Sequence, residues 1–556
     1  MDDVLITNLS PELLRSSLRT LISLGGHNQQ AFVQHVRRHI TSSPATTPSG
    51  KELFPVPNVL SDACIKYLAD TRCVFSCKLS LQAVYRLSEF CQAIVAANAT
   101  WELESSLEKA LEGFGGDIVQ CVQSLKEAGL VPTDELKEAL RDLVKSLSQM
   151  RAYCVGSKPQ RLTYPLTRGE RQVHDIFSFL FPTEASAPDA QPVKERIDVK
   201  LPTSSKVETF KLGDLQFPRL FNGFWQLSSP AWGSASADKQ EQALKSLVEA
   251  GLYAADMADH YGDAELVYGD FRNKLAPKVQ SKVYAATKWC VFGPVKVPIT
   301  EAWVLENVEA RYRRLGGCVD LLQFHWYDYE VKDWLFILEQ LIRLTKSRPD
   351  LVRAIGLCNF DSDYTVEACE YLISTTGSVG IVSNQVQFSL LDSRPLQRMC
   401  AVCDKYGLKL LTYGSFSGGL ISEKWLGQPA PDLYSESLKL TPSQRKYYDI
   451  ITTWGTWAEF QELLAALVRV GSKHQVSLTN VASRWVLQQP AVGAVIVGTR
   501  LGVSAHEGEN LRVFDFSLDE EDIAVINRAA LGVDMVKSVA IYQKIGDCGH
   551  EYRSMH

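Results

Sequence analysis

Four side chains with complementary chemistry lie near the ends of three consecutive predicted β-strands. Asp256 and Tyr261 stand at and just after the first of these strands, Lys288 ends the second, and His325 ends the third. A free phenol is a weak acid with a pKa of about 10, and a neighbouring ammonium lowers that pKa by favouring the phenolate. Asp256 would hold the ammonium through a charge-assisted hydrogen bond, and His325 would orient a carbonyl oxygen. Together these groups suit reduction of a carbonyl with hydride from a nicotinamide cofactor.

The elements that must position these side chains begin at about residue 206. From there, short apolar runs alternate with helical patterns such as those of residues 236–251 and 299–316, which is typical of βα units and a parallel sheet. Eight such units over roughly 300 residues predict an α/β fold of the (β/α)8, or TIM barrel, type, and a doubly wound sheet is the alternative. The predicted strands are 219–225, 253–259, 282–288, 319–325, 353–358, 380–386, 408–414 and 494–498.

Active sites of such barrels lie at the carboxyl ends of the strands. This rule selects Asp256, Lys288 and His325 and, at later strand ends, three more polar side chains, namely Asn359, Gln385 and Tyr413. Three tryptophans also lie at strand ends, and they are expected either to line a substrate pocket or to pack the barrel mouth: Trp225, Trp289 and Trp326.

The first 155 residues have a different pattern, which predicts a small all-α module. Ser10 and Pro11 form a helix start, and leucines recur at helical spacing over residues 134–154. Residues 156–205 are expected to be a linker, because their stretch EASAPDAQPV is rich in proline and alanine. The barrel is then expected to occupy residues 206–533, followed by a C-terminal tail of residues 534–556.

Composition narrows the class of protein. The 556 residues are 46% apolar and 22% charged, as in globular proteins, and the net charge of −6 shows no basic bias for nucleic acid. The sequence contains no run of about 18 apolar residues, so no membrane span is predicted. The start MDDVLITN lacks the pattern of a secretory signal, and thirteen cysteines occur without framework spacing. We therefore expect reduced thiols and a cytoplasmic protein.

No metal site is expected. His35 and His39 are four residues apart but lack the glutamate of the zinc-protease motif, so a solvated helix face is the better interpretation. Cys73 and Cys77 have the same spacing, but no second pair of cysteines or histidines accompanies them at zinc-site spacing.

An ordered set of motifs is similar to those of the aldo-keto reductase family. It covers residues 207–533 approximately, about 60% of the chain. The family reduces aldehydes and ketones with NADPH on a TIM barrel, so the resemblance implies this fold and this activity. The motifs are DMADHYGDAE (256–265), AATKW (285–289), DLLQFHW (320–326), IGLCNF (355–360), SNQVQFSLLD (383–392), LLTYGSFSGGL (410–420) and VIVGTRLGVSAHEGENL (495–511).

The resemblance also implies roles for individual residues. Tyr261 matches the general acid, and Asp256, Lys288 and His325 complete its tetrad. The remaining matched positions bind the cofactor: Asn359 and Gln385 at the carboxamide, Tyr413 stacked on the nicotinamide, Arg500 at the adenosine 2′-phosphate, and Glu509 and Asn510 near the adenine.

Two classes of function remain open from the sequence. The first is an NADPH-dependent reductase of a small-molecule aldehyde or ketone, which the intact tetrad favours. The second is a cofactor-binding regulatory or interaction subunit, because some relatives of this fold serve in that way and the N-terminal helical module would bind a protein partner.

Overall fold

The computed structural model describes residues 6–42, 47–127, 133–156, 162–181, 196–202, 205–435, 438 and 440–554. The chain divides into two compact units. The first consists of Met1–Val193, Ser228–Asp238 and Pro431–Lys439, and the second of Lys194–Leu227, Lys239–Ala430 and Leu440–His556.

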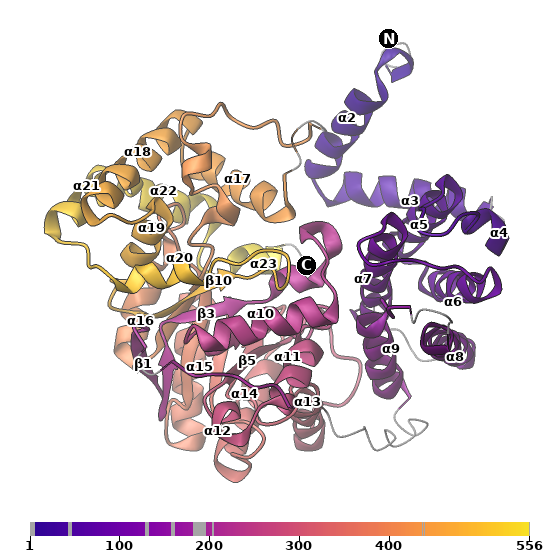
Figure 1. The fold of residues 1–556 in the computed structure, drawn as a ribbon. Helices are drawn as coiled ribbons and strands as arrows, with labels where there is room; N and C mark the ends of the chain where they lie inside the picture. Colours follow the sequence, from indigo (N-terminus) through magenta and orange to yellow (C-terminus); the bar gives the residue numbers. More distant parts are fainter. Residues whose placement is uncertain are drawn as a thin grey trace. The chain divides into compact units, whose positions relative to one another are not determined.

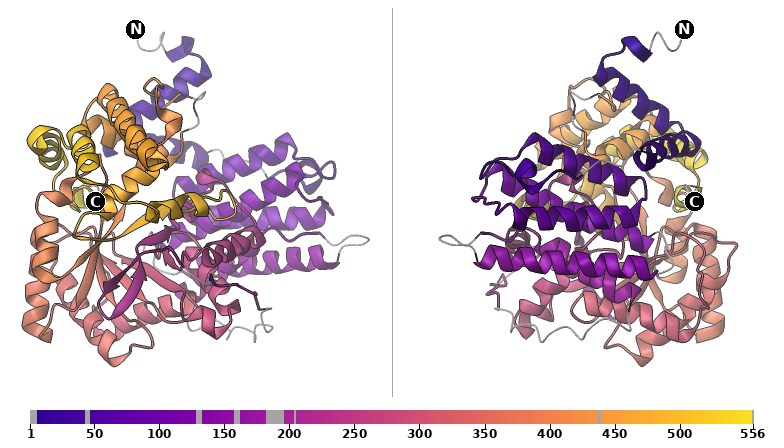
Figure 2. Two further views of the ribbon diagram at one scale, coloured as in Figure 1. Left: turned by 60° about the vertical axis from the view of Figure 1, so that its left-hand side comes forward. Right: turned by 90° about the vertical axis from the view of Figure 1, so that its right-hand side faces the viewer.

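The first unit is built from helices (Figures 1 and 2), as its leucine spacing predicted. Ring packing of Phe90 against Tyr67 and Phe114, with ring centroids 5.6 and 4.5 Å apart, lies in its core. In the described part of residues 11–181, the α-helices are α2 (Pro11–Ser23), α3 (Gly26–Ser42), α4 (Gly50–Leu53), α5 (Asp62–Ser76), α6 (Ser80–Ala96), α7 (Ser106–Glu127), α8 (Asp134–Gly156) and α9 (Thr167–Leu180).

Helix α9 differs from expectation, because it lies inside the stretch 156–205 predicted as a linker. Its side chains Val173 and Ile176 are fully buried in the helical core. The helix is strongly amphipathic, and burial of one apolar stripe is what stabilises such a helix. Residues 184–193, on which the linker prediction rested, lie outside the described residues.

The second unit contains a closed barrel of eight parallel strands, which confirms the predicted TIM barrel. Around the barrel the strands follow one another in chain order, and the last pairs with the first. They are β3 (Leu220–Gly223), β4 (Ala254–Asp256), β5 (Tyr284–Cys290), β6 (Leu321–His325), β7 (Ile355–Cys358), β8 (Ile381–Gln387), β9 (Lys409–Tyr413) and β10 (Val492–Gly498).

Helices follow the strands and enclose the barrel (Figure 1). The main ones are α10 (Ala237–Glu249), α11 (Ala264–Lys274), α13 (Glu301–Arg314), α14 (Asp333–Ser347), α15 (Ser362–Thr376), α16 (Met399–Tyr406), α17 (Pro442–Trp454), α18 (Trp457–His474), α19 (Leu478–Leu487), α20 (Glu507–Leu511) and α21 (Glu520–Ala530). Among the described residues, none of the helices combines the length and the apolar character needed to cross a membrane.

An antiparallel hairpin of β1 (Thr209–Leu212) and β2 (Leu215–Pro218) precedes the barrel. Its Phe217 is fully buried and packs on Phe221 of β3 and Tyr284 of β5, near the amino ends of these strands. The amino end of the barrel is therefore filled with apolar side chains, which leaves the carboxyl ends of the strands to present polar groups.

The segment predicted as a C-terminal tail also forms helices, α22 (Val536–Ile545) and α23 (His550–Ser554). Ile541 and Cys548 are buried there. These residues therefore pack as part of the barrel unit.

Candidate active site

A buried ion pair forms the centre of the site. Asp256 ends β4 and Lys288 lies in the neighbouring β5, and both are almost inaccessible to solvent. The Lys288 Nζ donates to Asp256 Oδ2 at 2.6 Å and to the Met257 carbonyl oxygen at 2.9 Å. Burial by itself lowers the pKa of Lys288, but the attraction of Asp256 together with the smaller effects of Tyr261 and Cys358 outweighs burial, so the pKa lies above its ordinary value. The ammonium therefore keeps its charge at neutral pH.

Two glutamine side chains hold the other oxygen of this carboxylate. Asp256 Oδ1 accepts hydrogen bonds from the Nε2 groups of Gln323, at 2.8 Å, and Gln385, at 2.7 Å. Gln385 Nε2 also donates to Gln323 Oε1 at 2.7 Å. Sequence motifs did not indicate Gln323, although this residue stands two positions before His325 on the same strand and must therefore face the same side of β6.

Tyr261 lies on the loop between β4 and α11, with its ring over the buried ammonium. Lys288 Nζ is 4.7 Å from the centroid of this ring, and His260 packs edge-on against it. Burial raises the pKa of Tyr261 above its ordinary value, although Lys288 acts in the opposite direction. The sequence predicted a lowered pKa, but the loss of solvation outweighs the attraction of the ammonium. The phenol is therefore protonated at neutral pH.

His325 completes the predicted group of four at the carboxyl end of β6. It is buried and its ring contacts Phe292, with centroids 5.2 Å apart, and Tyr552, at 6.1 Å. The structure thus brings all four tetrad residues to the carboxyl ends of β4, β5 and β6, where parallel pairing places Lys288 opposite Gln323.

The next predicted residues surround the carboxyl ends of β7, β8 and β9. Asn359 has a left-handed backbone with φ of 55°, and its N–H donates to the Gln385 carbonyl oxygen at 2.8 Å. The Tyr413 hydroxyl donates to Asn359 Oδ1 at 3.0 Å. Asn359, Gln385 and Tyr413 therefore lie together on one side of the mouth, as their strand positions predicted.

Arg500, Glu509 and Asn510 follow the last strand. Arg500 is half-buried two residues after β10, and Asn510 is half-buried in α20. Glu509 Oε1 accepts hydrogen bonds from the Ser477 hydroxyl and from Asn480 Nδ2, both at 2.6 Å. These bonds tie α20 to the start of α19.

Trp289, one of the three tryptophans predicted near the substrate, faces away from the barrel interior. Side chains alternate along a strand, so Trp289 points to the side opposite Lys288, where it packs on Trp303 of α13 at 5.2 Å. Trp326 is fully buried, and its Nε1 donates to the Asp328 and Val331 carbonyl oxygens. The pocket prediction is therefore wrong for Trp289, whereas for Trp326 it stays a prediction. Trp225 lies half-buried in the short helix η1 (Trp225–Ser228), and its pocket role stays a prediction.

The C-terminal segment supplies contacts that no sequence motif indicated. The Tyr552 hydroxyl is 2.7 Å from the Tyr413 hydroxyl and accepts from Lys446 Nζ at 2.9 Å. Arg553 donates to the Asn359 carbonyl oxygen and lies over the Tyr329 ring. Only tertiary packing places this distant segment at the barrel mouth.

Comparison with known proteins identifies the family. The model of the aldo/keto reductase family matches residues 219–530, more than half of the chain. The chain belongs to the aldo/keto reductase family. The family match does not include the helices of residues 1–193.

Relatives of this aldo/keto reductase have varied names. Flagellar radial spoke protein 5 of Chlamydomonas reinhardtii is 31% identical over 271 residues, which cover 42% of this chain and 49% of that protein. The chain thus matches about half the length of that relative. The chloroplastic pyridoxal reductase of Arabidopsis thaliana is 26% identical, over 52% of this chain and 78% of that protein. A solved structure of a thermostable aldo-keto reductase is 21% identical, with a TM-score of 0.43, over 58% of this chain and 99% of that one.

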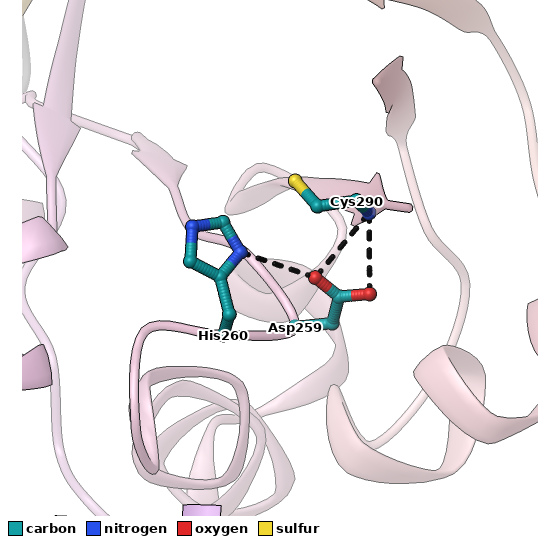
Figure 3. Close-up of side chains that lie close together, drawn as sticks. All are labelled: Asp259, His260 and Cys290. Carbon is teal, nitrogen blue, oxygen red and sulfur yellow. Dashed lines mark hydrogen bonds and ion pairs between the residues drawn. The ribbon is translucent and has the colours of Figure 1, made fainter. Parts of the chain in front are cut away.

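Among the residues that the structure describes, one group resembles a metal site. It consists of Asp259, His260 and Cys290, whose possible ligand atoms lie within 4.8 Å of one another. Asp259 Oδ1 accepts from His260 Nδ1 at 3.3 Å, and its carboxylate also accepts from the Cys290 backbone N–H (Figure 3). Arg311 pairs with the same carboxylate. Burial holds the pKa of the Cys290 thiol well above its ordinary value. The group therefore orders the loop that carries Tyr261.

Proposed function

We propose that the protein reduces an aldehyde or ketone to the alcohol with NADPH. The observation that carries this proposal is the buried Asp256–Lys288 pair, 2.6 Å long, beneath the protonated phenol of Tyr261. A buried ion pair with fully engaged oxygens costs solvation energy, so its presence at a barrel mouth favours a role in chemistry.

In this proposal the side chains move one proton. NADPH, when bound, supplies the hydride to the carbonyl carbon, and becomes NADP⁺. Tyr261 donates its phenolic proton to the carbonyl oxygen, which becomes the alcohol hydroxyl. The Lys288 ammonium, 4.7 Å from the ring, stabilises the phenolate that remains, and Asp256 keeps that ammonium in place. His325 orients the carbonyl oxygen from the neighbouring strand.

The residues proposed to hold the cofactor have suitable chemistry. Asn359 Nδ2 and Gln385 Oε1 offer hydrogen bonds to a carboxamide, since Asn359 Oδ1 and Gln385 Nε2 are already engaged within the protein. Tyr413 offers an aromatic face. Arg500 suits a phosphate, because a guanidinium binds phosphate oxygens bidentately and no described residue pairs with its guanidinium. Glu509 and Asn510 are proposed to lie near the adenine.

The experiment that tests this function is a substrate panel. Purified protein is mixed with NADPH and a series of aldehydes and ketones, and the loss of NADPH absorbance is followed. Pyridoxal belongs in the panel because it is an aldehyde and one relative is named a pyridoxal reductase. Turnover that Tyr261→Phe abolishes would support the proposal. Absence of turnover on every carbonyl, with NADPH bound, would contradict it.

A second candidate function is that of an interaction subunit. The observation that favours it is the similarity to a radial spoke protein, together with the helical module that precedes the matched region. In that case residues 1–155 and the packed helix α9 would bind a protein partner, and the barrel would serve as a cofactor-dependent scaffold. Equal partner capture by wild type and Lys288→Met, with no carbonyl turnover by either, would favour this second function.

A further inference from the structure

The C-terminal segment of residues 547–553 lies on the side chains proposed to receive the nicotinamide. A chain of hydrogen bonds runs from Lys446 Nζ to the Tyr552 hydroxyl, at 2.9 Å, and on to the Tyr413 hydroxyl, at 2.7 Å. Tyr413 in turn donates to Asn359 Oδ1 at 3.0 Å. The carboxamide oxygen of Asn359 and the hydroxyl of Tyr413 are therefore already engaged by this chain.

The ring of Tyr552 also crosses the mouth. Its centroid is 6.1 Å from that of His325 on β6, while its hydroxyl reaches Tyr413 on β9. The phenol thus spans between the two sides of the site where the proposed acid-base group and the proposed cofactor residues face each other. In the proposed binding mode, a nicotinamide stacked on Tyr413 would meet this ring.

Close backbone packing brings the segment down onto Asn359. A Cβ atom added to Gly549 would lie 1.8 Å from the Asn359 carbonyl oxygen, which only glycine avoids. Arg553 donates to the same oxygen, and its guanidinium lies 4.0 Å from the centroid of the Tyr329 ring.

Buried charges anchor the segment to the barrel. Asp547 Oδ2 accepts from the Ser362 N–H at 2.9 Å, at the start of α15. Arg394, which is 1% exposed, donates to the Asp547 carbonyl oxygen at 3.1 Å and pairs with Glu551 at 3.3 Å. The Gly549 N–H donates to Asp361 Oδ1 at 2.6 Å. Such a set of partners indicates a defined docking site for this segment.

We propose that residues 547–553 are an autoinhibitory segment, which occupies the nicotinamide side of the proposed cofactor site and competes with NADPH for it. This inference rests on the proposed function, because it takes Asn359 and Tyr413 as nicotinamide-binding residues. If only molecules with the segment undocked bind NADPH, the apparent dissociation constant for NADPH equals the intrinsic constant divided by the fraction of such molecules. Undocking of the segment would therefore set the affinity for NADPH, and a partner or modification that removes it would activate the enzyme.

The test compares two ligands on four full-length proteins. NADPH carries the nicotinamide, and 2′-phospho-ADP-ribose lacks it. The first protein is the wild type. In Gly549→Ala the added Cβ forces the segment away from Asn359, and Tyr552→Phe removes the hydrogen bonds of the hydroxyl. His550→Ala is the matched control, because His550 is exposed in the same segment. Dissociation constants are measured by calorimetry, and hydrogen exchange of residues 547–553 reports whether the segment is docked.

We expect Gly549→Ala to bind NADPH at least about 10-fold more tightly than wild type, and Tyr552→Phe about 2- to 10-fold more tightly. 2′-Phospho-ADP-ribose should bind all four proteins equally, and His550→Ala should match wild type. Saturating NADPH should accelerate exchange in residues 547–553 of the wild type.

Other outcomes separate the two proposals. Unchanged NADPH affinity in a variant whose segment exchanges freely would overturn the competition while leaving the proposed function in place. Weaker NADPH binding by Gly549→Ala would show that the segment clamps the cofactor, which also overturns the inference. If neither ligand binds any of the proteins, the proposed NADPH dependence fails, and the competition fails with it.

Discussion

Replacing Tyr261 by phenylalanine removes one oxygen atom and should separate catalysis from folding. In the proposed reaction the hydroxyl donates the proton, so its loss should remove carbonyl reduction while NADPH still binds. The ring itself remains, and with it the contacts to Lys288 at 4.7 Å and to His260 at 4.8 Å. The ion pair of Lys288 and Asp256 does not involve the phenol and should persist.

The size of the effect follows from the role. Loss of a general acid lowers a rate by about 10²- to 10⁴-fold, which corresponds to about 2.7–5.5 kcal/mol of activation free energy. The free energy of unfolding should change by less than about 1.5 kcal/mol, because at most one neutral hydrogen bond is lost. The assay is steady-state NADPH consumption with the best carbonyl of the panel, together with urea unfolding of the same preparation.

Tyr268→Phe is the matched control. Tyr268 is also a buried tyrosine of this barrel, but its hydroxyl donates to the Tyr284 carbonyl oxygen at 2.8 Å, away from the ion pair. This variant should lose about 0.5–1.5 kcal/mol of stability and keep its activity. The reasoning is refuted if Tyr261→Phe turns over at the wild-type rate, or if both variants lose activity in proportion to stability.

Four further outcomes are expected. Asp256→Ala should lower the free energy of unfolding by about 3–5 kcal/mol, because it leaves the Lys288 ammonium buried without its counter-charge. Urea unfolding measures this change, and a loss below about 1 kcal/mol would contradict the prediction. Arg500→Ala should weaken NADPH at least about 10-fold in fluorescence titrations and leave NADH unchanged, whereas equal loss for both would exclude a phosphate contact. Burial raises the pKa of Tyr261, so the acid form of Tyr261 is present below that pKa and is lost as the pH rises through it. We therefore expect kcat/KM to stay flat between about pH 6 and 9. A decline of kcat/KM in this range would contradict the role of Tyr261 as the acid. A fragment of residues 194–556 should fold and reduce the same carbonyls, and a folded, NADPH-binding but inactive fragment would show that the helical unit contributes to the site.

Strand positions were predictable because the barrel imposes a local pattern. Each strand is buried on both faces, so it appears as a short apolar run between helical segments, and its last polar residue lies at the carboxyl end. This pattern placed Lys288 and His325 correctly. It failed for Trp289, because a residue's position at a strand end does not by itself say which face its side chain takes.

The sequence by itself determined the family, the barrel and the residue types of the site, because periodicity and ordered motifs are local properties of the chain. Only the tertiary structure decided how those residues are used. It placed Gln323 and Gln385 on Asp256, and it raised the pKa of Tyr261 through burial, a quantity that depends on every neighbouring element. It also brought Tyr552 to Tyr413, 139 residues away along the chain. Contacts between segments so far apart leave no periodic signal, since they arise from packing after the barrel has closed.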